Sequence, residues 1–208
     1  ERIRKTYEEI GRHVYSNTLN IDNYKFIAGK YDNIDEIKNA PEEGWIDFKT
    51  GDLWGEESHG WFKTSVKVPE EFAGQTIALS FHTFLGDWDN TTNPQFILYV
   101  NGEHIQGLDV NHQETILTHN AVAGEVYNID LHAHIGRIED KKSTLHGKLV
   151  TIDEEARKLY FNLSVPHIVA TKLHEEDKRR IDMLTVLNDT INLIDLRRPF
   201  TKEYNESL

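Results

Sequence analysis

Histidines are the residues of this sequence best suited to chemistry, because the chain has eleven of them and no cysteine. Any metal site must therefore use His, Asp or Glu. His132 and His134 are two residues apart, so a strand places both imidazoles on one face, a spacing that some zinc sites use. Zinc also needs a third ligand, and a strand with inward Leu131 and Ile135 explains the solvent-facing pair without a metal. We therefore assign no metal ligand.

The polar segment 87–93 gathers oxygen-bearing side chains around one aromatic ring. Such a segment could bind calcium, or it could hydrogen-bond a sugar that stacks on Trp88 beside Asp87 and Asp89. It lacks the glycine and the closing glutamate of an EF-hand loop, so it matches no known calcium pattern. Asp, Asn and Thr are also the ordinary residues of turns, which makes a polar hairpin loop the simpler interpretation.

Asp109 and His112 belong to a polar run, 107–112, that follows a predicted hairpin. On a β-sandwich this run lies at a loop or a sheet rim, where Asp109 and Asn111 would cap a turn. The second hypothesis is that Asp109 and His112 face another domain or its sugar, because a rigid hairpin presents charged and titratable groups outward. The sequence leaves both hypotheses open.

Other catalytic signatures are missing from the sequence. It has no G-x-S-x-G, Walker or G-x-G-x-x-G motif, and no grouping of Ser, His and Asp supports nucleophilic or phosphoryl chemistry. Adjacent acidic residues at 42–43, 56–57 and 154–155 could in principle be glycosidase carboxylates. Pairs of this kind are typical of solvated charge, so we name no catalytic residue.

The amino-acid composition limits the classes of binding partner and the cellular compartment that we expect for this chain. Lys and Arg total 23 against 35 Asp and Glu, a formal net charge of -12, whereas a nucleic-acid binder needs clustered basic side chains. No apolar run approaches the roughly 20 residues of a membrane helix, and the charged start does not resemble a signal peptide. We expect no nucleic acid and no membrane as partners. The lack of cysteine fits a reducing compartment, and the sequence does not begin with Met, so we expect a trimmed piece of a cytoplasmic protein.

The region from about 54 to 135 must supply the scaffold, because its apolar residues recur with period two between turn residues. Asn101-Gly102 is the strongest hairpin signal, since both residues tolerate a positive φ. The run 95–100 before it is apolar on both faces, which places it inside a sheet. Two further runs, 62–68 and 76–82, have inward-facing residues that we expect to be Phe62, Val66, Val68, Ile77, Leu79 and Phe81. This pattern predicts an antiparallel β-sandwich of jelly-roll type.

Helical patterns flank this region. Residues 1–12 predict a short amphipathic helix, and a helical pair follows after Lys148. Thr151 opens a capping-box sequence, and Pro166 should kink or interrupt the first helix of the pair. The second helix is expected from about 175 to 198. The predicted fold is therefore mainly β, a jelly-roll-like sandwich with a short N-terminal helix and a C-terminal helical pair.

Four phrases of the predicted sandwich carry a family resemblance: HGWFK at 59–63, VPEEFAG at 68–74, LYVNGE at 98–103 and QGLDVNH at 106–112. Together they resemble the N-terminal β-sandwich of bacterial and fungal-vacuolar α-mannosidases of glycoside hydrolase family 38. The helical part, from KLY at 158–160 to DLRRP at 195–199, is similar to the segment that leads to the catalytic domain in that family. The resemblance implies a β-sandwich domain with its N-terminal helix at 1–150, and a helical linker at 151–208 leading towards an absent catalytic domain.

What the resemblance implies for activity is retaining hydrolysis of α-mannosides by an aspartate nucleophile beside zinc. That machinery belongs to the catalytic domain, which would be the partner of this segment, with an α-mannoside as the parent enzyme's substrate. The family's first metal motif has the form His-x-His-x-Asp, and here Gly136 stands where the aspartate should be. We therefore expect no cofactor in this segment, zinc only in the parent's catalytic domain, and no hydrolysis by the segment alone.

Two other functions remain as alternatives. One is a free-standing carbohydrate-binding module whose loops, including 87–93, recognise sugar directly. The other is a scaffold for a homo-oligomer, which draws on the aromatic segments around Trp54 and Trp61. The sequence does not rank one above the other.

Overall fold

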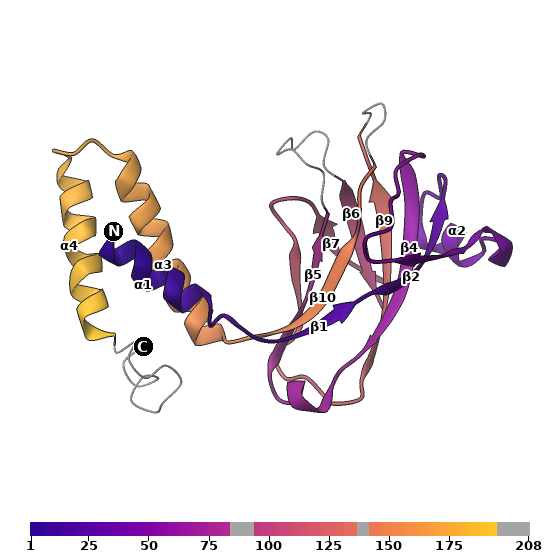
Figure 1. The fold of residues 1–208 in the computed structure, drawn as a ribbon, viewed down its shortest axis with the longest axis horizontal. Helices are drawn as coiled ribbons and strands as arrows, with labels where there is room; N and C mark the ends of the chain where they lie inside the picture. Colours follow the sequence, from indigo (N-terminus) through magenta and orange to yellow (C-terminus); the bar gives the residue numbers. More distant parts are fainter. Residues whose placement is uncertain (84–93, 137–141, 195–208) are drawn as a thin grey trace. The chain divides into compact units, whose positions relative to one another are not determined.

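The computed structural model describes residues 1–83, 94–136 and 142–194, which form two compact units (Figure 1). One unit is a sandwich of residues 17–151, and the other is a helical unit built from residues 1–16 and from residue 152 onward. The sequence-based boundary at residue 150 joined the N-terminal helix to the sandwich. In the structure this helix packs against the C-terminal helices, so both ends of the chain contribute to one helical unit.

Two β-sheets form the sandwich. The four-stranded sheet has the order β1 (Tyr15–Ile21), β10 (His146–Ile152), β5 (Thr76–His82) and β8 (Glu114–Thr118). The six-stranded sheet has the order β3 (Ile46–Lys49), β2 (Asn23–Ala28), β4 (His59–Lys67), β9 (Val126–His134), β6 (Gln95–Val100) and β7 (Glu103–Leu108). Every pairing in the six-stranded sheet is antiparallel. The predicted mainly β, antiparallel sandwich is thereby confirmed.

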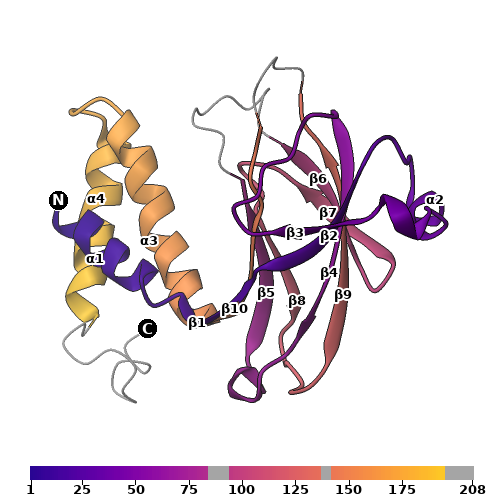
Figure 2. The same ribbon diagram turned by 45° about the vertical axis from the view of Figure 1, so that its right-hand side comes forward.

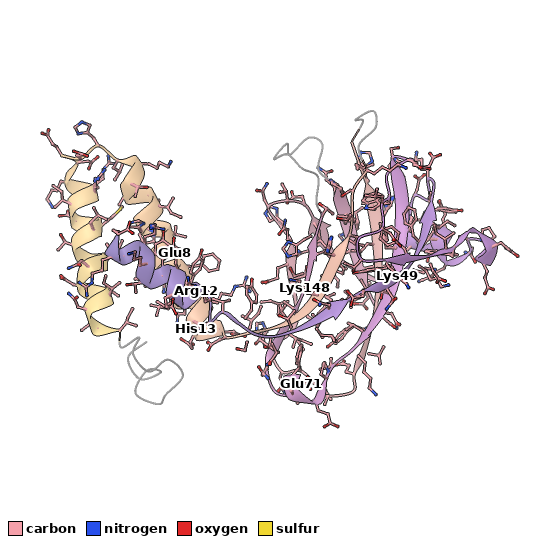
Figure 3. The ribbon with its side chains drawn as sticks, in the orientation of Figure 1. Glu8, Arg12, His13, Lys49, Glu71 and Lys148 are labelled. Atoms are coloured by element: carbon pink, nitrogen blue, oxygen red, sulfur yellow. The ribbon has the colours of Figure 1, made fainter. Side chains whose placement is uncertain are left out.

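Alternate apolar residues of the strands make the core between the two sheets. All six residues predicted to point inward from 62–68 and 76–82 are buried. Phe62 lies among the rings of Phe26, Phe48 and Trp54, with centroids 4.6, 5.1 and 5.3 Å away. Aromatic pairs of this kind contribute about 0.5–1.5 kcal/mol each beyond the area they bury. Charged side chains such as Lys49 and Glu71 lie on the outside of the sandwich (Figure 3).

Strand β6 lies inside its sheet, between β9 and β7, as predicted. Its two faces differ, however, because Phe96 and Leu98 are buried whereas Ile97 remains 37% exposed. The outward apolar residues of this strand therefore belong to the surface of the sandwich. That surface carries the candidate site.

The Asn101-Gly102 hairpin joins β6 to β7 and has the predicted geometry. Both residues have a positive φ, 53° at Asn101 and 84° at Gly102, as a tight two-residue turn requires. The Asn101 side chain also accepts a hydrogen bond of 2.9 Å from the backbone N–H of Asn128 on β9. This bond ties the turn to the neighbouring strand.

A short helix, α2 (Ile34–Lys38), lies outside the six-stranded sheet (Figure 2). Its N-cap is Asn33, whose side chain accepts hydrogen bonds from two backbone N–H groups of the first turn. Ile37 of this helix is fully buried and forms a small second core with Ile27 and Trp61. The outer face of the sheet is therefore partly covered, and Trp61 is fixed in place beneath this cover.

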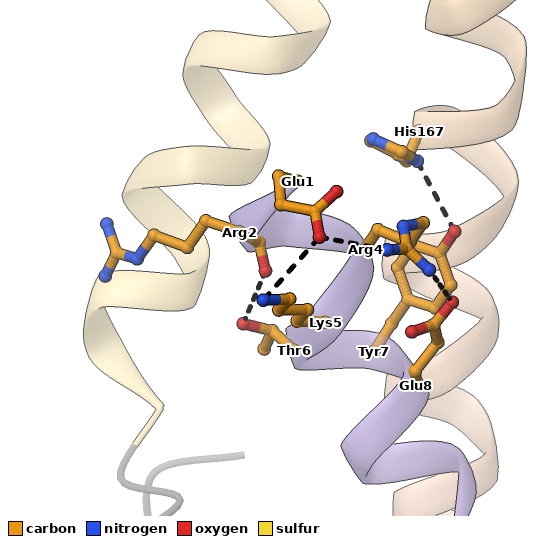
Figure 4. A network of polar contacts seen from close by, with 8 residues as sticks. All are labelled: Glu1, Arg2, Arg4, Lys5, Thr6, Tyr7, Glu8 and His167. Atoms are coloured by element: carbon orange, nitrogen blue, oxygen red, sulfur yellow. Dashed lines mark hydrogen bonds and ion pairs between the residues drawn. The ribbon is translucent and has the colours of Figure 1, made fainter.

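The described residues of the helical unit form three helices: α1 (Arg2–Gly11), α3 (Glu154–Lys172) and α4 (Lys178–Leu193). Helix α1 buries Ile3, Tyr7 and Ile10, the three residues that its sequence places at helical spacing. Arg4 forms ion pairs with Glu1 and Glu8 along the exposed side of α1 (Figure 4). No helix in the described ranges is both long and apolar enough to cross a membrane.

Two sequence-based predictions about α3 can be compared with the structure, and the capping-box prediction is wrong. The N-cap is Asp153, which accepts a hydrogen bond from the N–H of Ala156, whereas Thr151 lies within β10 and accepts one from the N–H of Asn17. Strand pairing thus takes precedence over the capping-box pattern. Pro166 does not interrupt α3, so of its two predicted effects the interruption is wrong and the kink stays a prediction. Proline removes the bond to the carbonyl of residue 162, and that carbonyl belongs to an exposed residue where water can replace the lost donor.

Candidate functional site: a histidine-lined hollow on the six-stranded sheet

The register of three neighbouring strands brings histidines together on the outer face of the six-stranded sheet. His59 on β4 lies directly opposite His134 on β9, which in turn lies opposite Gln95 on β6. One row further along, Trp61, His132 and Ile97 lie side by side in the same order. Residues two apart on a strand share a face, so both rows point away from the sandwich core.

A hollow of about 410 Å³ opens over these two rows. The edge strand β7 helps to create it, because Gly107 lies opposite Ile97 and has no side chain to cover it. We call this feature the histidine hollow. Its lining consists of His59, Gln95, Phe96, Ile97, Gly107, Leu108, Asp109, His132 and His134.

His132 is held rigidly by Trp61. The two rings are stacked with an angle of 4° between their planes and 4.5 Å between their centroids. Trp61 is itself fully buried, and its indole N–H donates a 3.0 Å hydrogen bond to the carbonyl of Tyr31. The imidazole of His132 therefore has a fixed orientation in the floor of the hollow.

Three imidazole nitrogens at the hollow are buried without a hydrogen-bond partner among the described residues. They are Nδ1 of His59 and both ring nitrogens of His132. Nδ1 of His134, by contrast, lies 3.1 Å from the carbonyl oxygen of Ser58. Buried polar atoms are normally hydrogen-bonded, so these three nitrogens are exceptions to the usual pattern.

Burial also lowers the pKa of His59 and of His132 below the ordinary histidine value. Neighbouring positive charge adds to this effect, chiefly from His134 for His59 and from His59 for His132. The nearby carboxylate of Asp32 opposes it at both residues. Both imidazoles are consequently neutral at pH 7, and a neutral imidazole offers one donor and one acceptor.

The three histidines are not placed as a zinc site. Tetrahedral zinc needs nitrogens that converge about 2.0–2.1 Å from one point, and Nδ1 of His134 instead lies 3.1 Å from a backbone carbonyl oxygen. Within residues 1–83, 94–136 and 142–194 no three His, Cys, Asp or Glu side chains are placed to hold a metal.

Comparison with known proteins assigns the family. A family model described as the jelly roll domain of alpha-mannosidase, Ams1-like, matches residues 26–168, well over half of the chain. The chain belongs to this family of α-mannosidase jelly-roll domains. The match runs from β2 through most of α3 and includes every residue of the histidine hollow. Comparison with curated protein sequences gives no match.

Solved structures with a similar backbone include several β-glucuronidases. One from an uncultured Clostridium sp. has 14% identity and a TM-score of 0.42, with 66% of the jelly-roll chain covering 29% of that protein. Ruminococcus gnavus β-glucuronidase in complex with D-glucuronic acid has 12% identity and a TM-score of 0.44, with 67% of this chain covering 30% of that one. The chain thus spans less than a third of each of these proteins.

Asp109 and His112 occupy different positions in the jelly-roll domain. Oδ1 of Asp109 accepts 2.8 Å hydrogen bonds from the N–H groups of Asn111 and His112, and it lies 3.0 Å from the His112 ring. Partial burial opposes ionisation of Asp109, but these hydrogen bonds hold its pKa below the usual value. Asp109 therefore caps the turn and also lines the hollow, whereas the side chain of His112 is 74% exposed outside it.

The other residues that the sequence singled out can now be compared with the structure. Asp87, Trp88 and Asp89 lie outside the described residues, so their proposed sugar contact stays a prediction. Trp54 and Trp61 are 2% and 0% exposed, which places their rings in the interior of the domain rather than on a surface for oligomer contacts. The sequence-based site omitted His59 and Gln95, because only the strand register shows that they adjoin His134.

Proposed function

We propose that the chain is the non-catalytic N-terminal domain of a zinc-dependent α-mannosidase, and that a catalytic domain follows it in the same protein. The observation that carries this proposal is the family match over residues 26–168. Hydrolysis of α-mannosides would then be the work of the parent enzyme. The jelly-roll domain would act beside the catalytic domain as its partner.

The chemistry of the histidine hollow supports this division of labour. A retaining glycosidase uses two carboxyl groups about 5–5.5 Å apart, one as nucleophile and one as acid. The hollow contains one carboxylate, Asp109, and its Oδ1 is already engaged by two backbone N–H groups. Its histidines, in turn, belong to no group of three His, Cys, Asp or Glu side chains that could hold a metal in the part of the chain that the structure describes. The hollow therefore lacks the pair of carboxyl groups that would cleave a glycoside.

The test is the activity of the longer protein encoded by the same reading frame. We expect it to hydrolyse 4-nitrophenyl α-mannoside, to lose activity with a chelator and to regain it with zinc. The matching α-glucoside serves as the substrate control and should react much more slowly. The proposal fails if the downstream sequence has no His/Asp metal motif and no aspartate nucleophile, or if the longer protein does not cleave α-mannosides.

A further inference from the structure

Helix α3 is apolar on two opposite sides, and only one of them is buried among the described residues. The inner side contains the buried residues Ala156, Leu163 and Ala170, and α1 and α4 are the helices that contact α3. Val165 lies two residues after Leu163, about 200° around the helix, and is therefore on the opposite side. A helix that is apolar all round is normally buried. The outer side of α3 therefore indicates a contact surface.

The outer side has three apolar side chains in a row, Phe161, Val165 and Ile168, each about half exposed. Lys158 and Lys172, both exposed, extend the row at its two ends. Successive positions in this row are separated by three, four, three and four residues. This is the spacing by which one helix packs lengthwise against another. We call this row of five residues the α3 seam.

We propose that the α3 seam is the docking surface for a helix of the domain that follows α4 in the parent protein. The partner helix has an apolar stripe with acidic side chains at both of its ends. The inference rests on the proposed function in one respect, that a further domain follows this chain. It does not depend on which glycoside that domain hydrolyses.

The charges of the seam argue against a second copy of the chain as the partner. Lys158 and Lys172 are each seven residues from Val165, so the seam is symmetric about its centre. If two seams packed in parallel, each lysine would face the same lysine of the other copy. If they packed antiparallel, Lys158 would face Lys172. Like charges oppose each other in both cases, whereas a partner with acidic ends attracts the same lysines.

The size of the seam favours a partner that is covalently linked. Its three half-exposed apolar side chains offer on the order of 300 Å² of surface, whereas a stable complex of separate proteins buries about 800 Å² on each partner. A covalent link raises the effective concentration of a neighbouring domain to about the millimolar range, so a smaller contact suffices. A domain joined to α4 has this advantage, because α4 packs against α3 in the same unit.

A hollow beside the seam provides space for an anchoring side chain. Its volume is about 410 Å³, and its lining includes residues from the end of α1 and from the first half of α3. Phe161 belongs both to this lining and to the seam, and Tyr15 and Tyr160 add two further rings. Aromatic or aliphatic side chains that fill such hollows contribute much of the energy of a protein contact. We expect an apolar side chain of the partner helix to enter this hollow.

The test measures how fast a cysteine at position 165 reacts with a maleimide. The chain has no cysteine, so Val165→Cys introduces one defined thiol. Its labelling is followed by mass spectrometry of the surrounding peptide, in the 208-residue chain and in the longer protein encoded by the same reading frame. We expect labelling to be about tenfold or more slower in the longer protein, because a docked surface reacts only when the contact opens.

Val186→Cys is the matched control, because Val186 is exposed on α4 and lies outside the seam. Its cysteine should react at similar rates in the two proteins. Replacing both seam lysines by glutamate in the Val165→Cys background tests the charge of the partner. This change should speed labelling of the longer protein by about threefold or more, because acidic partner residues would then repel the seam. The same change in the 208-residue chain should have little effect.

Several results would overturn the proposal. Equal labelling rates at position 165 in the two proteins would show that no domain covers the seam, and equal slowing at positions 165 and 186 would show general shielding. Slow labelling of the 208-residue chain would show that this chain covers its own seam, and slowing that grows with its concentration would identify a second copy as the partner. An unchanged rate after the lysine replacements would contradict an acidic partner.

The labelling rates and the α-mannosidase assay can fail separately. A longer protein that cleaves α-mannosides but is labelled fast at position 165 would refute the docking proposal alone. A longer protein that is protected at this position but inactive would refute the proposed function alone.

Discussion

Replacing Gly102 by valine tests whether backbone conformation at the β6–β7 hairpin specifies the fold. Gly102 has a φ of 84°, a conformation that β-branched residues resist strongly. Space is available for a side chain, because the nearest atom to an added Cβ is the Nζ of Lys38 at 3.5 Å. Any loss of stability must therefore come from the backbone rather than from a clash.

The expected loss follows from the cost of the left-handed conformation. That cost is roughly 1–2 kcal/mol for an L residue, and glycine avoids it. With a urea dependence of about 2 kcal/mol/M for a domain of this size, the unfolding midpoint should fall by about 0.5–1 M. Asn101 needs no change, because asparagine tolerates a positive φ and its side chain already bonds to Asn128.

Tryptophan fluorescence during urea unfolding is the appropriate assay. All four tryptophans, at 45, 54, 61 and 88, belong to the sandwich unit, so the signal reports on that unit alone. Gly107→Val is the matched control, since it makes the same substitution in β7 at a glycine without a positive φ. Equal midpoints for Gly102→Val and the unaltered chain would refute the reasoning, as would an equal loss in the control.

Three further outcomes follow from the structure. Gly147→Ala should destabilise the sandwich by about 1–3 kcal/mol, because an added Cβ would lie 2.8 Å from a buried ring carbon of Phe81. An unchanged urea midpoint would contradict this. Asp109→Ala should lower the free energy of unfolding by about 1 kcal/mol, because it removes the acceptor for two backbone N–H groups. His112→Ala should leave the free energy of unfolding nearly unchanged, because that side chain is exposed. Equal urea midpoints for the two variants would contradict the capping role of Asp109. Folding lowers the pKa of His59 and of His132, so the unfolded chain binds protons more readily than the folded one. Their contribution to stability is therefore complete above the ordinary histidine pKa of about 6.5, and it is lost as the pH falls through the lowered pKa values. Urea midpoints should therefore fall from pH 7 to 5 and fall less in a His59→Gln, His132→Gln variant, and identical pH profiles would disprove the assignment.

The strands and the hairpin could be predicted because their causes are local. Alternating apolar residues identify β4 and β5, and Asn101-Gly102 identifies a turn that few other dipeptides can form. The amphipathic spacing of Ile3, Tyr7 and Ile10 likewise predicts a helix with one buried face. In each case the physical requirement is met by residues close together in the sequence.

The histidine hollow could not be predicted in this way, because it depends on strand register. His59 and His134 are far apart in the sequence, and only the β4–β9 pairing places them opposite each other. The packing of α1 against α3 and α4 is equally non-local, which is why the sequence-based boundary joined α1 to the sandwich. Thr151 shows a related limit, because its pairing in β10 excludes the capping role that its neighbours suggest.

The central claim is that this jelly-roll domain does not itself perform hydrolysis. The most direct test is the rate at which the purified chain cleaves 4-nitrophenyl α-mannoside with zinc added. We predict no rate above the uncatalysed background, because the histidine hollow contains one carboxylate and the described residues include no group of three side chains that could hold a metal. Turnover that persists through purification and disappears with a chelator would contradict the account.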